Sequence, residues 1–276
     1  MNLSLHDTIE RLPGLVPGRG MTTGPGEVHI WYVFYDDLCD PGLLAAYRAL
    51  LTETERDRHQ RFVFERHRHQ YLVTRALQRA VLSFYAPVEP GDWRFAAGEY
   101  GKPDVCGPPA PVWPRFNLSN TDGLIACAVS TTLDELGVDV EDTTRKTETV
   151  DIADHFFSPF EAAALRALPA SRHRERFFSY WTLKESYIKA RGMGLSLPLD
   201  QFSFHLDDGP DIAISFDPRL GDDPAQWRFV LLRASDRHFF AAGARVGQGV
   251  DLLLRQTHYI PLSDPPSSLA GSGRKR

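Results

Sequence analysis

"FFSYWTLKESYIKARGMGLSLPLDQFSF" (residues 177–204) sets aromatic rings beside charged side chains and then ends at glycines and a proline. Trp181, Glu185 and Lys189 are four residues apart, so on a helix they lie close to one face. The spacing therefore predicts a rigid helix that can point a carboxylate and an ammonium into one cleft. An ordinary Glu–Lys pair beside a core tryptophan fits the same spacing, and both interpretations stay open at this point.

The segments on either side of this helix show both strand and helix patterns. Helical segments are expected within residues 41–85 and 160–168. Strands are expected within residues 27–38, 115–130, 135–142, 202–206, 212–216, 227–235 and 238–246. This mixed order, with hairpin-like strands late in the chain, predicts the α+β fold class.

Two of the expected helices carry clear local signals. In the first, an apolar stripe recurs at helical spacing, and Arg75 and Arg79 are expected on the opposite face; the stripe is Leu72, Val73, Ala76, Leu77, Ala80, Val81 and Phe84. In the second, Ser158 is a predicted N-cap, Pro159 takes the first helical position, and Glu161 falls at the capping-box position.

Composition excludes several classes of protein. The 276 residues are 42% hydrophobic and 24% charged, which is typical of a soluble globular protein with an ample core. A net charge of −5 disfavours a general nucleic-acid binder, and no apolar run approaches the roughly 20 residues of a membrane span. Three widely separated cysteines favour neither a disulfide framework nor a zinc site, so we expect a cytoplasmic protein.

Two carboxylates stand close together in "GVDVED" (residues 137–142). On a strand, Asp139 and Glu141 project from the same face, while Val138 and Val140 can face a core. Neighbouring carboxylates repel unless a positive charge lies between them, and hard oxygen ligands suit Mg²⁺ or Mn²⁺. A solvated strand end fits the pair as well.

The order of "GKP", "FNLS", "GVDVE", "FFS" and "WTLKESYIKARGMGLSLPLDQFSF" resembles that of the Sfp-type 4′-phosphopantetheinyl transferases. The resemblance covers roughly residues 27–245, and its last block is the most specific. It implies two similar α+β halves related by a pseudo-twofold axis, with the active site in the cleft between them. The expected division is a loose extension at 1–26, halves at 27–133 and 134–262, and a disordered tail at 263–276. A monomer is expected because both halves lie in one chain.

The resemblance also implies a reaction. The phosphopantetheine arm of coenzyme A passes to a serine of an apo acyl, polyketide or peptidyl carrier protein, with Mg²⁺, and 3′,5′-ADP leaves. Mn²⁺ in place of Mg²⁺ and the identity of the carrier stay open, although such chains tend to serve secondary metabolite biosynthesis. A homologue that binds coenzyme A or a carrier protein without catalysis is the alternative. The chain has neither the G-x-S-x-G of a serine hydrolase nor a G-x-G-x-x-G between strand and helix.

The acidic residues match the metal ligands of the family. Asp139, Glu141 and Glu185 are expected to converge on one Mg²⁺. Glu185 is also a candidate general base, but a carboxylate that holds Mg²⁺ is a poor base, so the ligand role ranks first. Asp139, Glu185 and Lys189 are thus the expected catalytic residues, and Trp181 matches a core aromatic that packs the helix.

The basic residues match phosphate contacts of the family. Lys189 is expected on the coenzyme A phosphates, and Lys184 either reaches a phosphate or caps the cleft with charge. Lys102 of "GKP" is expected on the 3′-phosphate, and Arg58 at a further phosphate contact.

One departure from the family pattern affects the phosphate site. Asn120 follows Ser119 where relatives carry a histidine, and Ser119 stays available to a phosphate. Because an asparagine cannot become cationic, the change removes a charge-assisted hydrogen bond worth about 1–3 kcal/mol. Either weaker coenzyme A binding or a different local phosphate contact is expected, with the reaction class unchanged.

Overall fold

The computed structural model of the chain describes residues 20–109, 113–146, 152–206 and 212–263. Residues 1–19 of the expected N-terminal extension and residues 264–276 of the expected tail lie outside this part. Residues 20–26 are packed on the first half, where Thr23 is buried and its amide donates to Thr131 Oγ1 (2.9 Å). Within the described residues, no helix combines the length and the apolar character needed to span a membrane.

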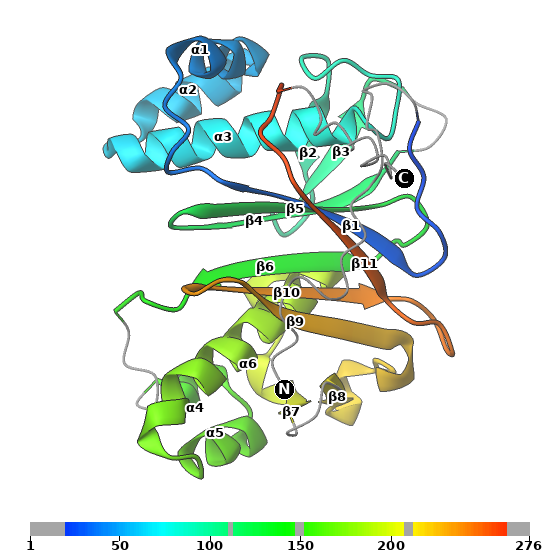
Figure 1. Cartoon of the computed structure of the whole chain (residues 1–276). Coiled ribbons are helices and arrows are strands. Elements are labelled where there is room, and N and C mark those ends of the chain that lie inside the picture. Colours follow the sequence, from blue (N-terminus) through cyan, green and yellow to red (C-terminus); the bar gives the residue numbers. More distant parts are fainter. Residues whose placement is uncertain (1–19, 110–112, 147–151, 207–211, 264–276) are drawn as a thin grey trace, which may run out of the picture.

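The elements form four layers, and this arrangement confirms the α+β class (Figure 1). Helices α1 (Pro41–Leu50), α2 (Glu53–Arg61) and α3 (Glu65–Leu82) lie on one side. Two sheets follow, and α4 (Ala153–Phe156), α5 (Pro159–Arg166) and α6 (Ala170–Arg191) lie on the other side. Each half thus consists of a sheet with one long helix, α3 or α6, on its outer face.

The first sheet has the strand order β11-β1-β5-β4. Its strands are β1 (Glu27–Phe34), β4 (Arg115–Thr121), β5 (Leu124–Ser130) and β11 (Leu253–His258). Strand β11 pairs in parallel with β1, so the expected second half, 134–262, returns one strand to the sheet of the first half. The sequence of β11 is largely polar and lacks a two-residue alternation of apolar and polar side chains, which is why no strand was expected there.

The second sheet has the order β6-β10-β9. Its strands are β6 (Leu136–Asp142), β9 (Trp227–Ser235) and β10 (His238–Arg245). Two hairpins stand apart from the large sheets: β2 (Arg94–Ala97) with β3 (Pro103–Gly107), and β7 (Phe202–Leu206) with β8 (Ile212–Phe216). The β2–β3 hairpin lies in a turn-rich stretch where no strand was expected.

An apolar core fills the space between the two sheets. It joins side chains of β1 and β5 to those of β6 and β10, and Val138 and Val140 belong to it, as expected. Because successive side chains of a strand point to opposite faces, Asp139 and Glu141 turn the other way, toward α6. The sheet interface therefore decides which face of β6 carries the acids.

The helix signals are confirmed with one correction. Ser158 Oγ accepts from the amide of Glu161 (3.2 Å), and Glu161 Oε2 accepts from the amide of Ser158 (3.0 Å), so α5 begins with a capping box. The apolar stripe of α3 is buried as expected. Arg79, expected on the opposite face, is instead fully buried, because α2 brings Glu55 to its guanidinium (2.6 Å) and Trp93 O accepts a further hydrogen bond from it.

Candidate active site

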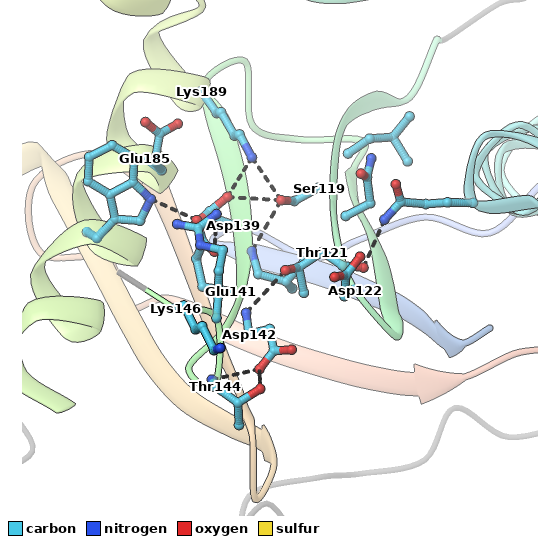
Figure 2. Close-up of a pocket in the computed structure, with 16 residues that line it drawn as sticks. Ser119, Thr121, Asp122, Asp139, Glu141, Asp142, Thr144, Lys146, Glu185 and Lys189 are labelled. Atoms are coloured by element: carbon cyan, nitrogen blue, oxygen red, sulfur yellow. Dashed lines mark hydrogen bonds and ion pairs between the residues drawn. The ribbon is translucent and has the colours of Figure 1, made fainter. Parts of the chain in front are cut away.

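A pocket of about 750 Å³ lies between the halves and is lined from both (Figure 2). The first half contributes Gln70 of α3 and the end of β4 with the turn after it. The second half contributes the end of β6, the loop that follows it and the face of α6 that carries Trp181, Glu185 and Lys189. The helix face inferred from four-residue spacing is thus the one that borders the pocket.

Strand β6 and helix α6 approach at backbone distance. A Cβ on Gly137 would lie 2.0 Å from the carbonyl oxygen of Ser186 and 2.5 Å from the amide nitrogen of Ala190. No side chain larger than hydrogen fits there, so the helix packs directly on the strand. This contact brings the polar face of α6 to Asp139 and Glu141, which point from the same face of β6 as Gly137.

Asp139, Lys189 and Ser119 form one hydrogen-bonded group (Figure 2). Lys189 Nζ lies 2.6 Å from Asp139 Oδ1 and 2.8 Å from Ser119 Oγ, and Ser119 Oγ donates to the same carboxylate oxygen (2.9 Å). Burial raises the pKa of Asp139 although Lys189 opposes the shift. The second oxygen, Oδ2, is buried and has no hydrogen-bond partner.

Glu141 is held from the α6 side. The indole N–H of Trp181 donates to Glu141 Oε1 (2.7 Å), and Arg145 lies 3.5 Å from Oε2. Burial, and then the charge of Asp139, raise the pKa of Glu141 to about 7. Trp181 was expected only as core packing; it does pack against Phe156, but its polar edge also orients a site carboxylate.

Glu185 is a carboxylate of the pocket that has no partner among the described residues. No described residue makes a hydrogen bond or an ion pair with it, and burial and the charge of Asp139 raise its pKa. A carboxylate without a partner beside two others gains from the arrival of a cation.

The acids fit a divalent cation chemically, although they do not yet form a closed binding site. In the part of the chain that the structure describes, no group of three or more His, Cys, Asp and Glu side chains is arranged to hold a metal ion. Instead, the Lys189 ammonium neutralises Asp139. Carboxylate oxygens are the ligands that Mg²⁺ prefers. Asp139, Glu141 and Glu185 border the same pocket, and Asp139 Oδ2 lacks a hydrogen-bond partner. The donor set therefore fits Mg²⁺.

Lys184 does not border the pocket, contrary to the expected phosphate contact. Its ammonium is buried in the second half, where it meets Glu161 Oε2 (2.7 Å) and the carbonyls of Leu199 (2.8 Å) and Phe202 (2.7 Å). One residue of offset from Glu185 turns it to another face of α6. Lys184 thus ties the start of α5 to the end of the loop after α6.

Lys102 also differs from its expected role. It reaches from the first half to the C-terminal end of α6, where its ammonium donates to the carbonyls of Lys189 (2.7 Å), Leu136 (3.2 Å) and Ala190 (3.3 Å). Burial lowers its pKa to about 8. A cation at this helix end satisfies free carbonyls and meets the negative end of the helix dipole. With its donors engaged there, Lys102 joins the halves and is absent from the pocket lining.

Of the other two expected phosphate contacts, Asn120 lines the pocket and Arg58 does not. Arg58 is exposed, lies over the ring of Tyr71 (5.6 Å to the centroid), and is not part of the lining. Asn120 is exposed and lines the pocket from β4, beside Ser119.

Sequence reasoning missed several residues of the lining. Arg145 and Lys146 follow β6 and add positive charge, and Thr121 and Gln70 come from the first half. Arg174 of α6 holds the loop after β6 through the carbonyls of Thr143 and Arg145. Arg145 and Lys146, four and five residues after Glu141, were the available signal, since such charges can balance carboxylates.

Comparisons with known proteins identify the family of the chain. The family model of the 4′-phosphopantetheinyl transferase superfamily matches residues 135–242. The 4′-phosphopantetheinyl transferase HetI of Nostoc sp. is 36% identical over 170 residues, which are 62% of this chain and 70% of the relative. A 4′-phosphopantetheinyl transferase of Bacillus subtilis is 34% identical over 185 residues, which are 67% of this chain and 80% of the relative.

The chain belongs to the 4′-phosphopantetheinyl transferase superfamily. The part that matches the superfamily model carries Asp139, Glu141, Glu185 and Lys189, whereas Ser119 and Asn120 precede it. Among solved structures, the holo-(acyl-carrier-protein) synthase of Thermotoga maritima is similar with a TM-score of 0.33 and 21% identity, over 40% of this chain and 62% of that one. The pocket of this superfamily member thus combines residues from inside and outside the matched segment.

Proposed function

We propose that this protein transfers the 4′-phosphopantetheine arm of coenzyme A to the serine of an apo carrier protein and releases 3′,5′-ADP. Superfamily membership supports the reaction class, and one feature of the pocket carries the proposal for this chain. The carboxylates of Asp139, Glu141 and Glu185 border one pocket together with Lys189, and their charges suit a cation together with a diphosphate. The carrier is an acyl, polyketide or peptidyl carrier protein, and the protein acts as a monomer.

Charge balance indicates which group each of the acids and Lys189 would bind. Asp139, Glu141 and Glu185 would hold Mg²⁺, which neutralises negative charge on a diphosphate when it is bound. Lys189, already 2.6 Å from Asp139, exchanges part of that contact for a diphosphate oxygen. Ser119 offers its hydroxyl to the same group, and Asn120 offers an uncharged amide N–H to a phosphate.

In the chemical step, the carrier serine oxygen bonds to the β-phosphorus and the bond from that phosphorus to the bridging oxygen breaks. The electron pair leaves on 3′,5′-ADP, and the serine proton passes to water next to Glu185. Because Glu185 has a raised pKa and no hydrogen-bond partner among the described residues, its carboxylate can share that proton. Its metal-ligand role ranks above this one.

The deciding experiment is the intact mass of apo carrier proteins after incubation with the protein, coenzyme A and Mg²⁺ or Mn²⁺. A mass gain of one phosphopantetheine is expected, together with free 3′,5′-ADP, and both should vanish in Glu185→Ala. Glu175→Ala is a matched control, because Glu175 lies on the same helix but outside the pocket lining.

A non-catalytic binding protein is the second candidate, and the residue that favours it is Asn120. If calorimetry shows coenzyme A binding but fatty-acid, polyketide and peptide carriers gain no mass, the protein is a binding protein and not a transferase.

A further inference from the structure

Three side chains of β4 accept hydrogen bonds from three backbone amides of β6. Asn117 Oδ1 accepts from the amide of Val138 (2.8 Å), Ser119 Oγ from that of Val140 (3.2 Å), and Thr121 Oγ1 from that of Asp142 (3.2 Å). The acceptors alternate along β4 and the donors alternate along β6. We call Asn117, Ser119 and Thr121 the polar ladder.

We propose that the polar ladder is a positioning device that fixes the register of β6, and with it the place of Asp139 and Glu141, against the first half. The inference rests on the proposed function, because it assigns the ladder to the geometry of the metal-binding acids.

The topology explains why β6 needs such a ladder. Strand β6 is an edge strand that pairs with β10 alone, and successive amides of a strand point to opposite edges. The amides of Val138, Val140 and Asp142 therefore point away from β10. A buried amide without an acceptor costs free energy, so these amides need partners from outside their own sheet.

The spacing of the ladder is regular. Each donor and acceptor are separated by 21 residues in the sequence, so the contacts advance along both strands in the same direction. Side-chain oxygens of β4 thus replace the carbonyls that a neighbouring parallel strand would offer. Phe116 and Leu118, whose side chains alternate with those of Asn117 and Ser119, pack on the core of the first half, which anchors the ladder.

This register controls the site because β6 has a period of two. A slip by one residue would turn the side chains of Asp139 and Glu141 from α6 to the sheet interface and that of Val140 toward α6. Ser119 also contacts Lys189 and Asp139, whereas Asn117 does not line the pocket and acts only through the backbone (Figure 2). Asn117 therefore separates positioning from direct contact with substrate.

The test compares variants that remove an acceptor with variants that keep it. Thr121→Val and Asn117→Leu lose the acceptor at similar size, and Thr121→Ser and Asn117→Asp retain one. Three quantities are measured on the full chain: hydrogen exchange of the β6 amides, Mg²⁺ affinity by calorimetry, and kcat and KM for coenzyme A.

For Thr121→Val and Asn117→Leu, we expect faster hydrogen exchange of the β6 amides, Mg²⁺ affinity lowered about tenfold, and a reduced kcat with little change in KM. Thr121→Ser and Asn117→Asp should recover all three quantities. Unchanged exchange at Asp142 in Thr121→Val and at Val138 in Asn117→Leu would overturn the ladder. Faster exchange with unchanged Mg²⁺ affinity and kcat would overturn its positioning role. If the wild-type protein transfers nothing, the proposed function fails, whereas amide exchange and Mg²⁺ affinity still test the ladder.

Discussion

The acceptors around a lysine decide what that lysine can bind, because its ammonium has three N–H donors. The ammonium of Lys184 donates to Glu161 and two carbonyls, and that of Lys102 donates to three carbonyls. Lys189 instead contacts Ser119 and Asp139 at the pocket wall. Of the three lysines expected at phosphates, only Lys189 is placed to exchange its contacts for a ligand.

A substitution of Trp181 tests whether Mg²⁺ affinity depends on the orientation of the Glu141 carboxylate. Trp181→Phe keeps an aromatic ring against Phe156 and removes the N–H that holds Glu141 Oε1. We expect Mg²⁺ affinity to fall about 10- to 100-fold, as for other residues that orient metal ligands, with a small change in unfolding midpoint. Calorimetric titration with Mg²⁺ measures it, and Trp113→Phe at an exposed site is the control. Equal affinities in both variants would remove Trp181 from this role.

A substitution at Asn120 tests whether a positive charge at this position would strengthen coenzyme A binding. Asn120→His is expected to tighten coenzyme A binding about tenfold at pH 6, because a protonated imidazole makes a charge-assisted hydrogen bond to phosphate. The gain should shrink at pH 8, where an imidazole with its ordinary pKa of about 6.5 is neutral. Dissociation constants at the two pH values measure it. A gain that is absent, or identical at both pH values, would contradict the assignment.

Among the elements, the contact between β6 and α6 is the tightest constraint on the site. Gly137→Ala would place a methyl group 2.0 Å from Ser186 O, so strand and helix must separate. A loss of about 1–3 kcal/mol in the free energy of unfolding is expected, together with lower transfer activity. Urea unfolding measures it.

The matched control for Gly137→Ala is Gly91→Ala, because a Cβ at position 91 meets nothing within 4 Å. A stable Gly137→Ala protein with full activity would show that the close approach is not required.

At the scale of the whole molecule, we expect a buried histidine in β1 to contribute to the pH dependence of stability. His29 Nε2 lies 3.1 Å from Glu27 Oε1, and Nδ1 lies 2.7 Å from the hydroxyl of Tyr85, which accepts from Trp31 Nε1. Burial lowers the pKa of His29, the charge of Arg255 adds to that shift, and Glu27 opposes it. The folded protein therefore binds this proton more weakly than the unfolded chain does.

The contribution of His29 to stability should consequently fall as the pH drops below about 6.5, where the unfolded chain takes up a proton that folded His29 resists. His29→Gln, which has no such proton, should lose less stability between pH 7 and pH 5 than the wild type. Urea unfolding at the two pH values measures this, with the exposed His155→Gln as control. An unchanged pH dependence in His29→Gln would exclude this histidine as the cause.

Local patterns were sufficient for much of this protein. The capping box of Ser158 and Glu161, the apolar stripe of α3, the shared face of Asp139 and Glu141, and the pocket-facing side of α6 all follow from contacts within a few residues. Such contacts have fixed geometry, because the periods of helix and strand set which side chains lie together. The α+β class follows from the same patterns.

Partners far apart in the chain decided the rest. Arg79 is buried because α2 supplies Glu55, β11 returns to pair with β1, and Lys102 caps a helix of the other half. The polar ladder likewise exists because two edge strands meet, although either strand alone shows only alternating polar residues. No local period encodes these contacts. They arise when buried amides, carbonyls and charges must each find a partner, and the packed halves determine which partner is within reach.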